Sequence, residues 1–253
     1  MVQRLERTGL EKLAFQYYRG EKDFPTLVFL PGFRSDMNGN KAQYLAQQCQ
    51  KRSQSCLLLD YSGHGESGGK FEEGSIGQWT KDALSVIDHA TSGPLIVVGS
   101  SMGGWIALHA ALARKERVVG MVGIAAAPDF TRDIKKKLSD QYKNDLEHQG
   151  FFAVPSEYGE DLIITQRLLE DGENQCLLDR QHDLAIPITL IQGKLDPDVP
   201  WKRAEEIKAS LPQAQVEIVY IEDGDHRLSR EQDLRLIDES VERMASIPYA
   251  GGG

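Results

Sequence analysis

The chain has 253 residues, of which 40% are hydrophobic, and its formal net charge is -9. A chain of this length can bury a substantial core, and one large α/β domain is the simplest interpretation. The acidic balance, with a sequence pI near 5.2, argues against a binder of nucleic acid or anionic membranes, because both need basic patches. No run reaches the roughly 20 apolar residues that a membrane span requires. We therefore expect no nucleic-acid partner and no stable membrane association.

The three cysteines, Cys49, Cys56 and Cys176, are an odd number without C-x-x-C spacing. This pattern indicates neither a disulfide framework nor a zinc site. A bridge between Cys49 and Cys56 stays open as an alternative, but reduced thiols in the cytosol are the preferred interpretation. The first seven residues resemble neither a signal peptide nor a transit peptide. The expected location is cytoplasmic.

The first half of the chain alternates between strands and helices. Apolar runs predict strands, and apolar residues at helical spacing predict the crossover helices between them. The predicted strands cover residues 10–18, 26–30, 55–60, 95–98 and 118–127, and the predicted helices cover residues 40–52 and 75–90. Such alternation is typical of a parallel sheet with helices on both faces.

Two loops follow the early strands. Pro31-Gly32-Phe33 is a glycine turn directly after the strand at 26–30, and residues 60–67 form a tight loop after the strand at 55–60. Ligands gather at this carboxyl edge of open α/β sheets. His64 lies in the second loop, ahead of the nucleophile identified below, and we interpret it as a structural, loop-stabilising residue.

The segment Gly99-Ser-Ser-Met-Gly103 lies between the strand at 95–98 and a helical pattern that starts near Trp105. It fits G-x-S-x-G, with Ser101 at the centre, and the strand-turn-helix context favours a nucleophile elbow over an ordinary turn. The elbow needs glycines because its backbone is strained and crowded. In this arrangement the backbone N-H groups of Met102 and Phe33 are the expected oxyanion-hole donors.

The alternation stops between residues 128 and 185, and this segment is predicted to form a small helical cap over the site. Residues 131–148 and 160–171 have helical patterns. Phe151, Phe152 and Val154 are candidates for an apolar pocket wall. The alternative is a surface excursion without a role in substrate binding.

The alternation resumes with strands predicted at 186–193 and 216–221 and helices at 201–210 and 230–245. Asp196 follows the first of these strands and is the predicted catalytic acid. Asp198 is its rival, but we expect it to cap the helix that starts near Pro200. His226 lies in the loop after the last strand and is the predicted base.

Ser101, Asp196 and His226 occur in the chain order nucleophile, acid, histidine, as the α/β-hydrolase fold requires. The expected fold class is therefore an α/β-hydrolase with a mostly parallel central sheet, flanking helices and a cap insertion at about 128–185. His226 would take the Ser101 proton as the hydroxyl attacks a carbonyl, while Asp196 holds the imidazole. This chemistry needs no cofactor and no metal.

Several segments narrow the comparison to one family of α/β-hydrolases, among them Met37-Asn-Gly-Asn-Lys-Ala42 and Pro155-Ser-Glu-Tyr158. Together with the motifs above, they resemble the mitochondrial acyl-protein thioesterase and acyl-glucuronide esterase family over residues 26–245. The resemblance implies a serine hydrolase of carboxylic esters or thioesters. Its substrate would be a small acyl ester or thioester, or an S-acylated protein.

Two alternatives remain open. The same scaffold and triad serve peptidases and carbon-carbon bond hydrolases, and an inactive hydrolase fold can serve as a binding module. The presence of all three triad residues argues against the inactive module.

Overall fold

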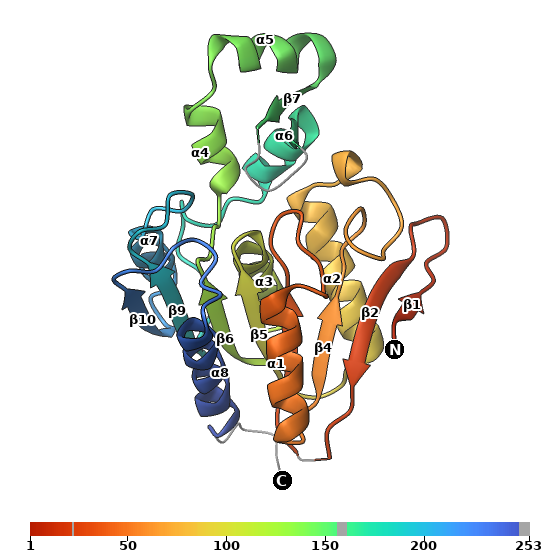
Figure 1. Ribbon diagram of the computed structural model, residues 1–253, viewed down its shortest axis with the longest axis vertical. Coiled ribbons are helices and arrows are strands. Elements are labelled where there is room, and N and C mark those ends of the chain that lie inside the picture. The colour runs from red at the N-terminus through yellow and green to blue at the C-terminus, as the bar shows by residue number, and fades with distance from the viewer. Residues whose placement is uncertain (22, 156–160, 248–253) are drawn as a thin grey trace.

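The computed structural model describes residues 1–21, 23–155 and 161–247, and its centre is a sheet of eight strands (Figure 1). Their order is β1-β2-β4-β3-β5-β6-β9-β10. The pairs β1-β2 and β2-β4 are antiparallel, and the other neighbours are parallel. The strands are β1 (Gln3–Leu5), β2 (Leu13–Tyr18), β3 (Thr26–Leu30), β4 (Cys56–Leu59), β5 (Leu95–Ser100), β6 (Val118–Ile124), β9 (Pro187–Gly193) and β10 (Gln215–Ile221).

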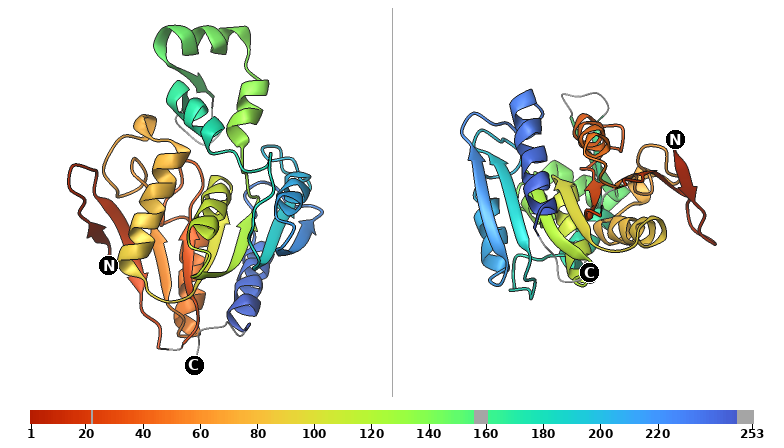
Figure 2. Two further views of the ribbon diagram at one scale, coloured as in Figure 1. Left: turned by 180° about the vertical axis from the view of Figure 1, so that it is seen from behind. Right: turned by 90° about the horizontal axis from the view of Figure 1, so that it is seen from below.

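Helices cover both faces of the sheet (Figures 1 and 2). On one face lie α1 (Asn40–Lys51) and α8 (Glu231–Ala245), and on the other lie α2 (Ile76–Ala90), α3 (Met102–Ala113) and α7 (Arg203–Ser210). Among the described residues, no helix combines the length and apolar character needed to cross a bilayer.

The continuous apolar runs of the central strands are explained by this layering. In β3, Val28 and Leu30 belong to the core beneath α2 and α3, whereas Leu27 and Phe29 belong to the core beneath α1 and α8. Successive side chains of a strand point to opposite faces. Every position of such a strand is therefore buried, and the sequence shows no polar alternation.

The segment 128–185 leaves the sheet after β6 and returns to it at β9. It contains α4 (Phe130–Lys136), α5 (Asp140–Gln149), a hairpin of β7 (Phe151–Val154) and β8 (Leu162–Thr165), and α6 (Gln166–Asn174). The prediction of a helix from residue 160 was wrong at its start, because residues 162–165 pair with β7. Ser156, Glu157 and Tyr158 of the family-like segment lie outside the described residues.

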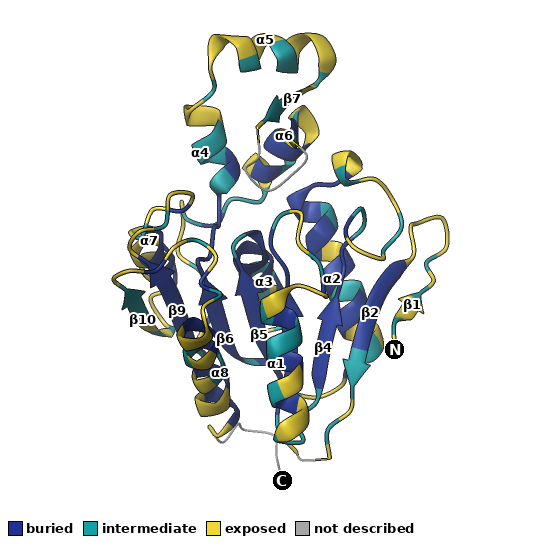
Figure 3. Cartoon of the chain, viewed as in Figure 1, coloured by how far each residue is buried: buried dark blue, intermediate teal, exposed yellow. Residues whose placement is uncertain are grey.

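Hydrogen bonds hold the two ends of this segment where it leaves and rejoins the sheet. The buried carboxylate of Asp129 accepts the backbone N-H groups of Leu177 and Leu178 at 2.9 and 3.0 Å. The side chain of Arg203, in α7, donates to the Pro128 carbonyl at 3.2 Å. At the far end, by contrast, α5 buries none of its residues, and it projects well beyond the sheet (Figure 3).

Candidate active site

Ser101 lies in the turn between β5 and α3, with a φ of 54°. This left-handed conformation costs a residue with a side chain on the order of 1–3 kcal/mol. Three backbone hydrogen bonds hold it: its N-H donates to Ile124 at 2.9 Å, and its carbonyl accepts from Gly104 and Ala127 at 2.8 and 3.1 Å. The turn is therefore fixed from both the sheet and the helix side.

The glycines around Ser101 are required by crowding. A Cβ on Gly99 would lie 2.2 Å from the Gly103 carbonyl oxygen, and a Cβ on Gly103 would lie 2.0 Å from that of Leu30. A Cβ on Gly32 would lie 3.4 Å from the Ser101 Cβ. The turn after β3 therefore passes directly beside Ser101.

The imidazole of His226 links the two other residues predicted for the site. Its Nε2 lies 3.1 Å from the Ser101 Oγ, and its Nδ1 lies 2.9 Å from the Asp196 Oδ2. An ionised carboxylate can only accept, so Nδ1 carries a proton and Nε2 faces the hydroxyl as an acceptor. The three side chains come from loops after β5, β9 and β10 and form one hydrogen-bonded chain.

The side chain of Asp196 is fully buried, and both of its carboxylate oxygens accept hydrogen bonds. Its Oδ1 accepts the backbone N-H groups of Asp198 and Val199 at 2.8 and 2.9 Å, and its Oδ2 accepts from the Gln192 amide at 3.1 Å. Burial acts to raise the pKa of this carboxyl, but His226 and the backbone donors outweigh it and hold the pKa below its usual value. The carboxylate is thus ionised at neutral pH.

Asp198 does not cap the following helix as expected. The helix α7 begins at Arg203, and its N-cap residue is Lys202, which makes no side-chain capping bond. Asp198 is exposed and contributes its backbone N-H to Asp196 instead. Carboxylate oxygens of both aspartates and a ring nitrogen of His226 lie within 4.8 Å of one another, as a cation site would need. However, both Asp196 oxygens already accept hydrogen bonds from protein groups.

The two predicted oxyanion donors belong to segments that border Ser101. Met102 is the first residue of α3, so its N-H is one of the four that lack a carbonyl partner within the helix. Phe33 follows Gly32, whose position beside Ser101 is described above. The Phe33 ring packs edge-on against Phe71 and Phe130, with ring centroids 4.8 and 5.8 Å away. These contacts fix the loop that carries its N-H.

The three candidates for a pocket wall do not share one face. Phe151 is 38% exposed, whereas Phe152 is buried and stacks on Tyr142 with ring centroids 4.5 Å apart. Val154 is half-buried. Because neighbouring side chains of a strand point in opposite directions, Phe151 lies opposite Phe152 and Val154, so a single wall of all three is wrong. A pocket role for the individual residues stays a prediction.

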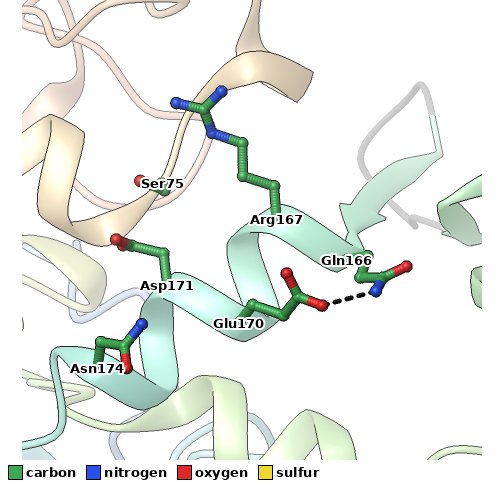
Figure 4. Close-up of a pocket in the computed structure, with 6 residues that line it drawn as sticks. All are labelled: Ser75, Gln166, Arg167, Glu170, Asp171 and Asn174. Atoms are coloured by element: carbon green, nitrogen blue, oxygen red, sulfur yellow. Dashed lines mark hydrogen bonds between the residues drawn. The ribbon is translucent and has the colours of Figure 1, made fainter.

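A polar hollow of about 440 Å³ lies between α6 and the start of α2. Figure 4 shows the lining residues, Ser75, Gln166, Arg167, Glu170, Asp171 and Asn174. The Asp171 carboxylate accepts the Gly77 N-H at 2.7 Å and so ties α6 to α2. The lining contains none of Ser101, Asp196 and His226, and we assign the hollow a structural role.

Lys41 was not singled out in the sequence, yet it contacts the loop that carries His226. Its ammonium donates to the Arg227 carbonyl at 2.5 Å and to the Ser229 hydroxyl at 3.4 Å. Burial and then the charge of Arg227 lower the pKa of Lys41 to about 8, against the opposing charges of Asp225 and Asp233. Lys41 is therefore placed to position His226 through its loop.

We expect Lys41→Met to lower kcat about tenfold with little change in KM, because a charge-assisted hydrogen bond contributes roughly 1.5–3 kcal/mol. Lys41→Arg should recover most of the activity. In the wild type, kcat should fall as pH rises through about 8 and the ammonium loses its proton. The arginine variant keeps its charge, so this alkaline decline should disappear. A pH profile that is identical in both proteins would contradict the positioning role.

The fold and the comparisons with known proteins define the class. The strand order and the elbow between β5 and α3 are those of an α/β-hydrolase. A protein from Agrobacterium vitis S4 has the same fold, with a TM-score of 0.93, 37% identity and coverage of 97% of this chain and 99% of that chain. A family model described as "Serine aminopeptidase, S33" matches residues 23–144. The chain is an α/β-hydrolase that acts on ester bonds.

The human relative is the mitochondrial palmitoyl-protein thioesterase ABHD10, which is 35% identical over 96% of this chain and 81% of its own length. The mouse structure of α/β-hydrolase domain-containing protein 10 matches with a TM-score of 0.88 and 33% identity, covering 96% of this chain and 98% of that chain. The chain belongs to the ABHD10 family of palmitoyl-protein thioesterases.

Proposed function

We propose that the chain hydrolyses carboxylic esters and thioesters through an acyl-enzyme on Ser101. The observation that carries the proposal is the hydrogen-bonded chain from the Ser101 hydroxyl through His226 to the ionised Asp196. A serine hydroxyl is a weak nucleophile unless an adjacent base takes its proton, and here the acceptor nitrogen is 3.1 Å away.

The reaction proceeds in two halves. As the Ser101 oxygen bonds to the acyl carbon, His226 Nε2 takes the hydroxyl proton and Asp196 stabilises the imidazolium. The same proton then passes to the departing alkoxide or thiolate, and the bond to the leaving group breaks. In the second half, water loses a proton to His226 as its oxygen bonds to the acyl carbon. The bond between the acyl carbon and the Ser101 oxygen then breaks, and His226 returns the proton to that oxygen.

The developing oxyanion would be stabilised by the N-H groups of Met102 and Phe33. The N-terminal end of α3 also carries a partial positive charge that favours this anion. Removing one such donor typically costs roughly 3 kcal/mol of barrier. Both donors belong to rigid backbone, so little reorganisation accompanies the reaction.

The substrate class follows from the relatives. The human relative is named as a palmitoyl-protein thioesterase, so we infer that acyl thioesters, including those of S-acylated proteins, are substrates here. The segment 128–185 would act as a cap over the acyl group. A cytoplasmic location stays a prediction, which rests on the three free cysteines. The named relatives, in contrast, are mitochondrial.

The peptidase alternative has one observation in its favour, the serine aminopeptidase model over residues 23–144. That range includes Ser101 but neither Asp196 nor His226. The similarity to the thioesterase, in contrast, extends over 96% of the chain. Ester and thioester hydrolysis is therefore the better-supported activity.

The test uses p-nitrophenyl esters and acyl-CoA thioesters of matched chain length, from acetyl to palmitoyl, with an amino-acid p-nitroanilide for the peptidase alternative. We expect hydrolysis of esters and thioesters, together with covalent labelling of Ser101 by a fluorophosphonate. Faster cleavage of the anilide than of the esters would favour the peptidase. Absence of both turnover and labelling would overturn the proposal and favour an inactive binding module.

A further inference from the structure

Gln192 is a buried side chain at the carboxyl end of β9, directly ahead of the loop that carries Asp196. It is 2% exposed, and the preceding strand residues Leu190 and Ile191 belong to the apolar cores on the two faces of the sheet. An amide in such surroundings is costly unless its polar atoms are hydrogen-bonded. The partners of this amide therefore indicate what the residue does.

The Nε2 atom of Gln192 contacts three parts of the acid loop, residues 193–199. It lies 3.1 Å from the Asp196 Oδ2, 3.3 Å from the Gly193 carbonyl oxygen and 3.4 Å from the Val199 carbonyl oxygen. A carbonyl and an ionised carboxylate can only accept, so the NH2 end of the amide faces all three. One side chain thus connects both ends of the acid loop to its carboxylate.

The backbone of the acid loop is also fixed against the segment that leads to His226. The N-H groups of Lys194 and Leu195 donate to the Ile221 and Gly224 carbonyls at 2.9 and 3.0 Å. These bonds place the main chain of the acid loop beside the base. The orientation of the catalytic carboxylate then depends on its own hydrogen bonds.

The two carboxylate oxygens of Asp196 are held in different ways. Oδ1 accepts the backbone N-H groups of Asp198 and Val199. Oδ2 accepts from His226 Nδ1 at 2.9 Å and from the Gln192 amide at 3.1 Å. The backbone bonds therefore anchor one oxygen, and the Gln192 bond sets the direction of the oxygen that the imidazole uses.

We propose that Gln192 is a positioning residue for the hydrolysis, which acts by holding Oδ2 of Asp196 where His226 Nδ1 can donate to it. The inference rests on the proposed function, in which His226 is the base. Without the Gln192 bond, a misdirected Oδ2 would leave the imidazole free to turn or to adopt the tautomer in which Nε2 carries the proton. The loss would therefore fall on proton transfer from Ser101 and not on substrate binding.

The first test is Gln192→Met, which keeps the length of the side chain but has no N-H group. We expect kcat for p-nitrophenyl butyrate to fall about tenfold, as the loss of one hydrogen bond to a charged group allows, while KM changes less than about twofold. Gln192→Asn keeps an amide that is one methylene too short to reach Oδ2, and it should lose as much activity. Gln192→His keeps an N-H donor the same number of bonds from Cα, and it should recover kcat to within about threefold of the wild type.

A double-mutant cycle tests whether Gln192 acts through Asp196. An Asp196→Ala protein has no carboxylate to position, so adding Gln192→Met to it should change kcat by less than about twofold. The rate at which a fluorophosphonate labels Ser101 gives the same comparison without turnover. A further loss of about tenfold in the Asp196→Ala background would show that the two residues act independently, and it would overturn the positioning role.

Gln54→Met is the matched control, because Gln54 is 1% exposed and its amide donates to the Pro25 carbonyl at 2.7 Å. Gln54 precedes the amino end of β4, whereas the triad loops follow the carboxyl ends of their strands. The control should lower the melting temperature, as Gln192→Met does, and leave kcat unchanged.

Equal losses of kcat in Gln54→Met and Gln192→Met would overturn the inference, because any buried amide would then have the same effect. Unchanged kcat in folded Gln192→Met and Gln192→Asn proteins would overturn it as well. A wild type that hydrolyses neither esters nor thioesters would contradict the proposed function itself. That outcome differs from an active wild type whose kcat is insensitive to Gln192.

Discussion

Replacing Ser101 with alanine is expected to lower kcat for ester and thioester hydrolysis by roughly four to six orders of magnitude, as in other serine hydrolases that lose their nucleophile. The variant keeps a Cβ in the left-handed conformation, so the strain of the turn and the stability of the protein should be unchanged. The measurement is the initial rate with p-nitrophenyl butyrate and butyryl-CoA, with the melting temperature as the check on folding.

Ser101→Gly provides a matched comparison. Glycine also lacks the hydroxyl, but it adopts a φ of 54° without steric cost. We expect this variant to be as inactive as the alanine variant. It should be at least as stable, because the relief of strain in the folded turn offsets the larger backbone entropy that glycine loses on folding. Residual activity above about one hundredth of the wild type in either variant would show that another group attacks the carbonyl.

Asp196→Asn should lower kcat by about four orders of magnitude, by analogy with the same change in serine proteases. The amide oxygen can still accept from the backbone N-H groups of Asp198 and Val199. In the wild type, His226 Nδ1 and the Gln192 amide both donate to Oδ2. In the variant, the asparagine NH2 group would take the place of Oδ2 and face these two donors. The imidazole would therefore adopt its other tautomer, in which the proton is on Nε2 and Nε2 can no longer accept the Ser101 proton.

Asp198→Asn is the control, because Asp198 is exposed and its hydrogen bond to Asp196 comes from its backbone N-H, which the substitution keeps. We expect a change of less than twofold. Both rates should be measured with fluorophosphonate labelling, which reports the nucleophilicity of Ser101 directly. If Asp198→Asn were the more damaging change, the acid would have to be reassigned to the rival residue.

Much of this architecture could be predicted because it depends on local patterns. Apolar runs predict the central strands, and the glycines of 99–103 are required by backbone crowding that any such turn would have. The chain order of Ser101, Asp196 and His226 then depends only on the loops that follow three buried strands. In a parallel sheet those loops meet at one edge.

The parts that could not be predicted depend on contacts between distant residues. Lys41 contacts Arg227 across 186 positions, and nothing in the sequence of its helix distinguishes this half-buried lysine from an exposed one. Gln192, whose amide donates to Asp196, is distinguished in the sequence only as a polar residue near the end of an apolar strand. The hairpin of β7 and β8 was missed because four-residue strands resemble the start of an amphipathic helix in sequence.

The hydrogen bonds from Leu177 and Leu178 to Asp129 bring the two ends of the 128–185 segment together. Once the ends of a loop are joined, doubling the length between them costs only about 0.6 kcal/mol of closure entropy. Insertions and deletions near α5, which buries none of its residues, should therefore cost little closure entropy, provided that Tyr142 keeps its contact with the buried Phe152. If the segment is the proposed cap over the acyl group, changes at its far end would alter the range of accepted acyl groups while the triad on the sheet stays constant.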